Sequence, residues 1–414
     1  MIKYLLFLLV IINNSRFYSQ NNSFKYYVDT LSSDSFFGRG YINQGHTEAA
    51  NFIANEFDKI GLKPKNGNQF FQKFNLDVNT FPRKVEVFLG NKKLSPGIDF
   101  IVDPSSGSAK GTFELIRVNL YNWERVIRNQ EFKSAKKAFL MDISGILDRD
   151  TLAMFKELKF RLAQLAPIVL LTNDKLTWSL STFEINFPLL VIKKSIFDTN
   201  LKSIELNIEN EFKKSLMTQN VIGFLSGKKS KYIVISAHYD HLGMMGSTIF
   251  PGANDNASGV SLLMNLAKYY CNKKTKYNML FICFGAEEIG LLGSKYFNEF
   301  PLVNMNKIKL VLNLDIVGTG TEGIAVVNAL EQKKYAKKIG AINKELSAFK
   351  KVKIRGQAPN SDHYWFSVNN VPSIFLYTLG GIKAYHDPMD QAMTLPLSKI
   401  NTLMNLITKF LKEV

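Results

Sequence analysis

Five short polar clusters contain the residue types that bind metal ions and activate water. Together they offer two histidines and three carboxylates. The candidate ligands are His238, Asp255, one of the pair Glu287 and Glu288, Asp315 and His386. Imidazole and carboxylate ligands suit zinc, and no cysteine stands in any of the clusters, which argues against a closed structural zinc site. The residue types therefore predict a hydrolytic centre that holds two zinc ions.

The adjacent acids Glu287 and Glu288 predict a division of roles at such a centre. Neighbouring side chains diverge, so one carboxylate is able to bind metal while the other removes a proton from water. Hydrolysis of an unreactive bond requires such a general base. Residue types alone leave open which glutamate takes which role.

Further polar residues in the same clusters are candidates for orienting the ligands. Asp240 follows His238 by two residues, and such residues face the same way in an extended chain. We expect its carboxylate to accept a hydrogen bond from the second ring nitrogen of His238, which fixes the tautomer. Asp390 either caps the element that follows it or orients His386. His241 is interpreted as loop structure.

Each cluster taken alone also has an ordinary structural interpretation. His238 would be a loop histidine with a polar neighbour, Asp255 would cap a helix, and Asp315 would form a salt bridge. Paired glutamates at the end of a strand are often only solvated. None of these interpretations explains why all the candidate ligands follow successive strands, so the metal centre is preferred.

The chain from residue 221 onward alternates between apolar runs and helical patterns. The expected strands are residues 232–237, 279–285, 310–314 and 373–377, and the expected helices are residues 257–270, 291–297, 332–346 and 397–411. Continuous apolar runs are typical of strands covered on both faces. We therefore predict an α/β fold with a mostly parallel central sheet flanked by helices. The polar clusters would then meet at its carboxyl edge, where such sheets bind ligands.

The segment from residue 81 to residue 210 has a different character. Short β-rich runs alternate there with a helical stretch at residues 151–166, and no catalytic cluster occurs. Earlier, residues 47–60 have helical spacing, with Thr47 placed to cap the start and Gly61 the end. We predict that residues 20–80 begin the catalytic domain, that residues 81–210 form an inserted smaller domain, and that residues 211–414 complete the catalytic domain.

The N-terminus is typical of an export signal. Lys3 precedes an apolar stretch at residues 4–12, which is too short to span a bilayer. We therefore predict a signal peptide over residues 1–19, a periplasmic or secreted protein, and no stable membrane insertion after the signal is removed. The two cysteines, Cys271 and Cys283, are expected to be buried thiols rather than a disulfide.

The charge balance raises the question of nucleic-acid binding. The chain has 52 Lys+Arg and 35 Asp+Glu, which gives a formal net charge of +17. The lysines are scattered in pairs, and no basic helix or basic motif with interleaved aromatic residues is present. We expect a solvated surface and no nucleic-acid partner.

The clusters also resemble a known enzyme family. In order, they read HYDHLG, PGANDNASG, FGAEEIGLLGS, LNLDIVG and YHDPMD. These motifs are similar to those of the di-zinc exopeptidases of metallopeptidase family twenty-eight, which includes bacterial leucyl-type aminopeptidases. Residues 38–64 resemble the N-terminal helical part of that family, and residues 81–210 resemble an inserted protease-associated domain. The resemblance implies release of N-terminal amino acids from peptides.

The resemblance also implies a role for each residue. One zinc would be held by His238 and Asp315, the other by Glu288 and His386, and Asp255 would bridge the two. Glu287 would be the general base, and Asp240 the acid that orients His238. The peptide bond between Asp255 and Asn256 would be cis. Ser361-Asp362-His363 matches a further motif of the family near the pocket, to which we assign no catalytic role.

Three other functions compete with an aminopeptidase. A glutaminyl cyclase resembles this family but uses a single zinc, and the complete set of five ligands favours two metal ions. A carboxypeptidase of the same family has the same metal motifs, which do not say which terminus is recognised. A non-catalytic receptor or scaffold should have lost ligands or the base, and here all six positions are filled.

Overall fold

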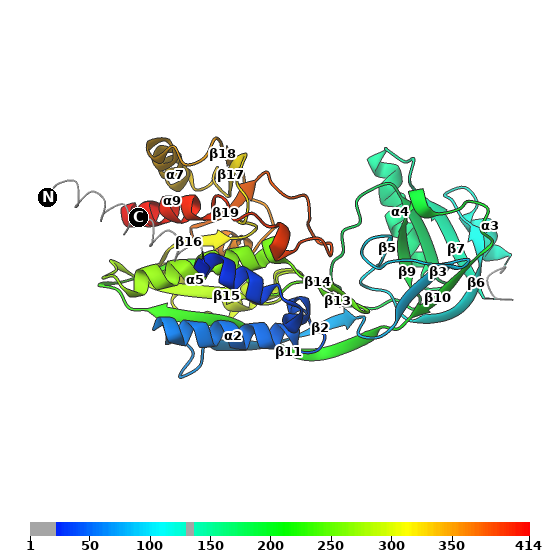
Figure 1. Cartoon of the computed structure of the whole chain (residues 1–414), viewed down its shortest axis with the longest axis horizontal. Helices are drawn as coiled ribbons and strands as arrows, with labels where there is room; N and C mark the ends of the chain where they lie inside the picture. The colour runs from blue at the N-terminus through cyan, green and yellow to red at the C-terminus, as the bar shows by residue number, and fades with distance from the viewer. Residues whose placement is uncertain (1–21, 130–135) are drawn as a thin grey trace.

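The computed structural model describes residues 22–129 and 136–414, and the signal peptide predicted over residues 1–19 lies outside the described residues. In these residues the chain forms a larger lobe and a smaller second lobe, which lie side by side (Figure 1). The larger lobe contains a sheet with helices on both faces. The second lobe, drawn in cyan to green, contains its own sheet and is formed by residues 85–208.

The sheet of the larger lobe has a parallel centre. Its strands lie in the order β1 (Lys63–Pro64), β11 (Glu211–Leu225), β15 (Tyr277–Phe284), β12 (Lys229–His238), β16 (Ile308–Leu314), β19 (Ser373–Leu379), β17 (Gly323–Val327) and β18 (Val352–Ile354), and β2 (Phe71–Thr80) also pairs with β11. β15, β12, β16 and β19 are parallel neighbours. The predicted α/β fold is confirmed, and the parallel arrangement holds for these central strands. Towards the edges, β11 and β17 pair antiparallel with the centre.

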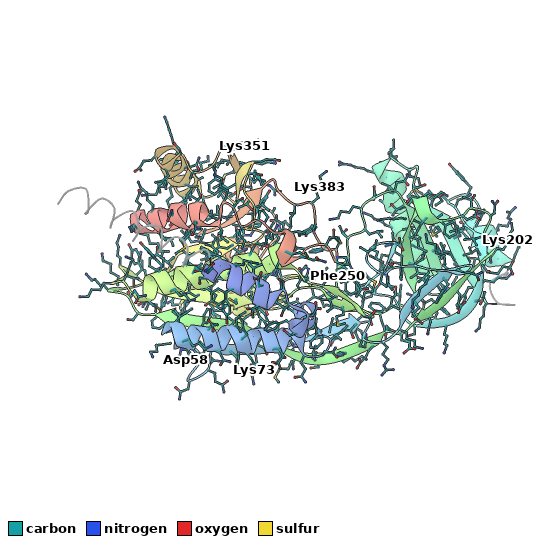
Figure 2. The ribbon with its side chains drawn as sticks, in the orientation of Figure 1. Asp58, Lys73, Lys202, Phe250, Lys351 and Lys383 are labelled. Carbon is teal, nitrogen blue, oxygen red and sulfur yellow. The ribbon has the colours of Figure 1, made fainter. Side chains whose placement is uncertain are left out.

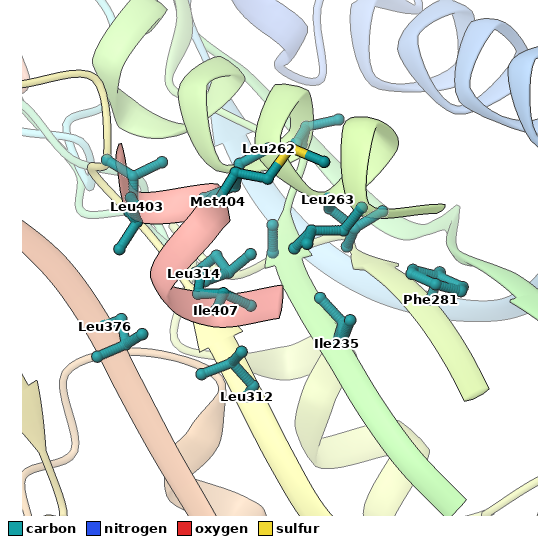
Figure 3. Close-up of a cluster of buried hydrophobic side chains, with 14 of the residues drawn as sticks. Ile235, Leu262, Leu263, Phe281, Leu312, Leu314, Leu376, Leu403, Met404 and Ile407 are labelled. Atoms are coloured by element: carbon teal, nitrogen blue, oxygen red, sulfur yellow. The ribbon is translucent and has the colours of Figure 1, made fainter. Parts of the chain in front are cut away.

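Helices cover both faces of this sheet. They are α2 (Gly45–Ile60), α5 (Ser258–Cys271), α6 (Leu292–Glu299), α7 (Lys333–Leu346), α8 (His363–Val368) and α9 (Ile400–Glu413). Alternate strand residues point to opposite faces. Ile235, Phe281 and Leu312 belong to the core with α5 and α9, as Figure 3 shows, whereas Val234 and Leu280 face α6 and α8. Burying each such side chain contributes about 1.5–3 kcal/mol, so both faces contribute to holding the strand ends in place.

Of the two capping residues predicted for α2, Gly61 is confirmed and Thr47 is not. Gly61 adopts a left-handed φ of 94°, and its backbone N–H donates to the carbonyl oxygens of Asp58 and Phe57, as expected of a terminating glycine. The predicted N-cap at Thr47 is wrong, because the helix begins at Gly45 after Gln44. Gln44 has a left-handed φ of 59°, and its carbonyl already accepts the N–H of Thr47.

The second lobe is a mixed sheet with two α-helices among its described residues. Its strands lie in the order β4 (Lys92–Lys93), β3 (Val85–Leu89), β10 (Ser203–Ile208), β6 (Ala109–Arg117), β7 (Lys137–Asp142), β8 (Ile168–Thr172), β9 (Leu189–Lys193) and β5 (Phe100–Val102). The helices are α3 (Trp123–Arg128) and α4 (Arg149–Leu162). α4 begins earlier than residue 151 because Asp148 caps it by accepting the N–H of Thr151 at 2.7 Å.

The two lobes share hydrophobic packing as well as a connecting ribbon. β2 and β11 pair antiparallel from Phe71 opposite Val221 to Thr80 opposite Glu211, and they run toward the second lobe in Figure 1. A hairpin of the larger lobe, β13 (Gly243–Met245) and β14 (Thr248–Phe250), also reaches across. Phe250 is fully buried in the core of the second lobe, and Figure 2 labels it where the lobes meet.

The described residues bear on two expectations from the sequence, one about the cysteines and one about membrane-spanning helices. Cys271 and Cys283 are free thiols, and Cys283 is buried in β15 as expected, whereas Cys271 at the end of α5 is only partly buried. None of the described helices combines the length and apolarity needed to cross a bilayer.

Candidate metal centre

The predicted ligands lie where the parallel central strands end. β12 ends at His238, which pairs with Phe284 at the end of β15, and Glu288 follows in the next turn. Asp315 comes directly after β16. Because parallel strands end at the same edge, their carboxyl ends bring these side chains together. Asp255 reaches the same place from the turn before α5, and His386 from the loop after β19.

Asp255 stands at the middle of the group. Its Oδ1 lies 3.2 Å from Nε2 of His238, and its Oδ2 lies 3.2 Å from Nε2 of His386. On one side, Oδ1 of Asp315 is 3.3 Å from the same His238 nitrogen. On the other side, Oε2 of Glu288 is 3.0 Å from the same His386 nitrogen. Each side therefore has one imidazole nitrogen and one acid of its own, and Asp255 offers one oxygen to each.

Backbone carbonyls set the tautomers of both histidines. Nδ1 of His238 lies 3.1 Å from the carbonyl oxygen of Asp240, and Nδ1 of His386 lies 2.8 Å from the carbonyl oxygen of Trp178. A carbonyl oxygen only accepts hydrogen bonds, so both Nδ1 atoms carry the proton. Both Nε2 atoms, which metal ligation requires to be unprotonated, then face the carboxylates.

The carboxylate of Asp240 acts on a different partner from the one expected. Its Oδ1 is 3.8 Å from Nδ1 of His238, which is too long for a hydrogen bond. It accepts instead from the backbone N–H groups of Glu287 at 3.1 Å and Glu288 at 3.3 Å. The extended geometry behind the expectation ends with β12 at His238, so the alternation of side chains does not continue to Asp240. Burial raises the pKa of Asp240 to about 6.

Asp390 also differs from both of its expected roles. It is fully buried and accepts the backbone N–H groups of Asn254 and Asp255 at 2.9–3.1 Å. Its hydrogen bonds go to these N–H groups rather than to His386, and it does not cap the short helix that follows it, Ala392–Thr394, whose N-cap residue is Gln391. These hydrogen bonds fix the backbone of the segment that carries Asp255. The peptide bond between Asp255 and Asn256 is cis, as the family resemblance implied.

His241 was interpreted from the sequence as loop structure and has a closer connection to the centre. Its side chain is fully buried, and its Nδ1 donates to Oε1 of Glu288 at 2.6 Å. Because Oε2 of Glu288 faces His386, His241 and His386 contact different oxygens of the same carboxylate. Ser361 acts similarly on the other side and donates to Oδ2 of Asp315 at 3.0 Å. Ser361 and His241 both stand in quoted motifs, Ser361-Asp362-His363 and HYDHLG, but neither received a role at the centre from the sequence.

The charges of the group fit a divalent cation. Burial by itself lowers the pKa of His386, but Glu288 and Asp255 outweigh it and raise that pKa to about 11. Likewise, Glu287 and Asp315 raise the pKa of His238 well above its usual value despite burial. The carboxylates thus place negative charge in a mostly buried space, where a bound cation would be stabilised. Imidazole nitrogen and carboxylate oxygen are donors that suit zinc.

Glu287 forms none of these close pairs, although one of its carboxylate oxygens lies within 4.8 Å of ligand atoms of His238 and Asp315. It lines a cavity of about 230 Å³ together with the five predicted ligands, Asn360, Phe375, Tyr377 and Tyr385. Burial, reinforced by the charge of Glu288, raises the pKa of Glu287 well above its usual value. A carboxyl group with a raised pKa in a cleft is a candidate for proton transfer.

Arg39 ties together the loops that carry the ligands. It is fully buried, and burial lowers its pKa to about 10, opposed by the charges of Asp390 and Asp255. All its hydrogen bonds go to backbone carbonyls, those of Leu31, Tyr239, Pro251, Gly252 and Asp255 at 2.7–3.3 Å. Arg39 therefore joins the loop after β12 to the loop of Asp255, a role that its residue type did not reveal.

We expect Arg39→Met to destabilise the metal-free protein by more than about 3 kcal/mol, because several buried carbonyls lose their donor at once and each unsatisfied group costs about 1–3 kcal/mol. Urea unfolding followed by circular dichroism measures the change. Arg128→Met is the matched control, because its ion pair with Glu124 is exposed and should contribute less than about 1 kcal/mol. Equal stability of the two variants would contradict the role of Arg39.

The sequence profile of peptidase family M28 matches residues 220–411, which include β12, β15, β16 and all five predicted ligands. Residues 220–411 belong to peptidase family M28. The resemblance stated from the motifs is thereby confirmed. In this M28 domain, the residues implied as zinc ligands are the ones whose Nε2 and carboxylate oxygens converge.

Relatives of the M28 domain are similar to the whole chain as well. Aminopeptidase YwaD of Bacillus subtilis (strain 168) is 27% identical over 386 residues, which cover 88% of this chain and 79% of YwaD. BSAP, a zinc aminopeptidase from Bacillus subtilis, superposes with a TM-score of 0.69 at 19% identity, over 95% of this chain and 94% of BSAP. An aminopeptidase from Aneurinibacillus sp. strain AM-1 gives a TM-score of 0.65 at 21% identity, over 95% and 93%. These superpositions show a shared fold that extends across both lobes.

Proposed function

We propose that this protein is an exported, zinc-dependent aminopeptidase that holds two zinc ions. The observation that carries the proposal is the position of Asp255, which directs one carboxylate oxygen to each of two histidines. Each of these histidines also has a second acid beside its Nε2. The M28 membership and the names of the relatives, which are aminopeptidases, support the activity. Export rests on the signal peptide predicted from Lys3 and the apolar residues 4–12.

We assign one zinc to His238 and Asp315, the other to Glu288 and His386, and both to Asp255 as the bridge. Bound zinc ions supply a Lewis acid that polarises the scissile carbonyl and lowers the pKa of water toward neutrality. The remaining chemistry belongs to the side chains of the protein. Glu287 removes a proton from the attacking water and returns it to the leaving amine.

The surroundings of Glu287 suit that role. Its backbone N–H is held by the carboxylate of Asp240 at 3.1 Å, which fixes where its side chain emerges. Its raised pKa makes its carboxylate a stronger base than an exposed glutamate. The cavity walls near its carboxyl group include Phe375, Tyr377 and Tyr385.

The choice of a substrate amino terminus over a carboxyl terminus follows the names of the relatives, because most of the acids in the cavity are the ones assigned to zinc. Of the described residues that line the cavity, several are acids and none is a lysine or an arginine. A substrate carboxylate would therefore find no cationic side chain among them. Peptide and protein N-termini are therefore the proposed substrates.

The purified enzyme is expected to contain two zinc ions per chain and to release the first residue from unblocked peptides. A chelator should abolish this release, and added zinc should restore it. Elemental analysis, aminoacyl-nitroanilides, and paired peptides with free or acetylated N-termini test the three expectations together. One zinc per chain with cyclisation of N-terminal glutamine would indicate a glutaminyl cyclase. Shortening of acetylated peptides from the other end would indicate a carboxypeptidase.

A further inference from the structure

The loop that carries His386 is held by the second lobe through a reciprocal pair of hydrogen bonds. Nδ1–H of His386 donates to the carbonyl oxygen of Trp178 at 2.8 Å, and the backbone N–H of Trp178 donates to the carbonyl oxygen of His386 at 3.0 Å. The acceptor that fixes the tautomer of this predicted ligand thus comes from the inserted segment, 208 positions away in the chain.

Lys175 fastens the same loop three residues earlier in the second lobe. Its ammonium group lies 2.7 Å from Oδ2 of Asp387 and donates to the carbonyl oxygens of Lys383 at 2.8 Å and Tyr385 at 3.1 Å. An ammonium group has three protons to donate. All of its donors are therefore directed to the residues on either side of His386.

The backbone of Gly97, in the second lobe, also lies close to the ring of Pro388 in this loop. A Cβ atom added to Gly97 would lie 2.5 Å from Cγ of Pro388, and Gly97 has a φ of 77°. Only a glycine permits this contact without displacing Pro388. The second lobe therefore contacts the loop both before and after His386.

The loop depends on outside support for its conformation. His386 has a φ of 53°, in the left-handed region, which costs a residue with a side chain about 1–2 kcal/mol. Such a conformation persists when the surrounding contacts enforce it. Trp178 is suited to provide that support, because it is 2% exposed, its Nε1 donates to the carbonyl of Val102 at 2.8 Å, and its ring packs 4.8 Å from that of Phe250.

We propose that Lys175 is a positioning residue of the metal centre. Through residues 175–178, the second lobe then holds the predicted ligand His386 in its binding orientation. Lys175 holds the loop so that Nδ1–H of His386 meets the carbonyl of Trp178 and Nε2 faces Asp255 and Glu288. The inference rests on the proposed function, in which His386 binds zinc. It assigns the inserted segment a role in the chemistry itself, beyond restricting access or presenting substrate.

The test compares Lys175→Met, Lys175→Arg and Lys194→Met with the wild-type full chain. Lys194 is the matched control, because it also forms a 2.7 Å ion pair, with Asp142, in the second lobe. We expect Lys175→Met to weaken the binding of one of the two zinc ions by a few-fold to about 10-fold, at or below the lower end of the about 10–100-fold that a direct partner of a ligand accounts for, because the carbonyl of Trp178 remains and Lys175 acts through the loop. Lys175→Arg should restore most of the affinity, and Lys194→Met should leave it unchanged.

Zinc affinity is measured by competition with a chromophoric chelator, and the visible spectrum of the cobalt-substituted protein reports the geometry of the ligands. Thermal melting of the metal-free variants should give the same midpoint for Lys175→Met and Lys194→Met. Wild-type zinc affinity and an unchanged cobalt spectrum in Lys175→Met would overturn the inference while leaving the proposed function intact. A wild-type chain that binds fewer than two zinc ions, or does not cleave peptides, would overturn the proposed function and the inference with it.

Discussion

Glu287→Gln is expected to lower kcat by at least about 100-fold while both zinc ions stay bound, which is the scale of losing a general base. The amide keeps the shape of the side chain but cannot take a proton from water. Zinc should remain because the closest contacts among the predicted ligands do not include Glu287.

The kinetic constants for a leucyl-nitroanilide and the zinc content of the variant test this prediction together. Glu299→Gln is the control, because Glu299 is an exposed residue at the end of α6 and should change neither value. Hydrolysis at the wild-type rate in Glu287→Gln would contradict the assigned base. A simultaneous loss of zinc would instead make Glu287 a ligand, which would also contradict the assignment.

Asp255→Asn is expected to weaken zinc binding by more than about 100-fold, because even an outer partner of a ligand accounts for about 10–100-fold. The amide removes the negative charge and leaves one oxygen in place of two, whereas the structure directs one oxygen of Asp255 to each histidine. Both ions should be affected, and the activity should fall with them.

Zinc per chain in a chelator-buffered solution measures the loss, and activity at saturating zinc shows whether excess metal restores it. Asp58→Asn is the control, since Asp58 is an exposed acid on α2, labelled in Figure 2. Circular dichroism and the melting temperature of the metal-free proteins show that the fold is retained. Full zinc content in Asp255→Asn would contradict the bridging role.

The two predictions separate the parts of the proposed centre. Glu287 and Glu288 are adjacent, and the structure directs Glu288 toward His386 and His241, whereas a carboxylate oxygen of Glu287 lies within 4.8 Å of ligand atoms of His238 and Asp315. The neighbouring N–H groups of both glutamates converge on Asp240. One buried acid thus fixes the backbone from which the proposed base and a proposed ligand diverge.

Residue types and their place in the chain determined much of the fold and the set of candidate ligands. The central strands were predictable because a strand covered on both faces must be apolar throughout, and each predicted strand lies within or close to an observed one. Polar residues that follow such runs are conspicuous because burying them uncompensated is costly. The M28 motifs added the division of roles between Glu287 and Glu288, which spacing alone left open.

Other parts of the fold lacked a clear local pattern. β2 and β11 are long antiparallel partners that lead from the sheet of the larger lobe to the second lobe. The hairpin β13–β14 places Phe250 in the core of the second lobe, although the hairpin belongs to the catalytic part of the chain. Pairing between distant segments depends on packing that no short window of sequence contains.

The contacts that orient the ligands were decided only by the tertiary structure. Asp240 and Asp390 use their carboxylates on backbone N–H groups, and His386 is oriented by the carbonyl of Trp178, far away in the sequence. Every residue has a backbone carbonyl and nearly every residue has an N–H, so neither gives a residue-type signal. The sequence by itself therefore determined which side chains are able to hold metal and act on water. Which atoms hold those side chains in place depended on how loops from two lobes meet in space.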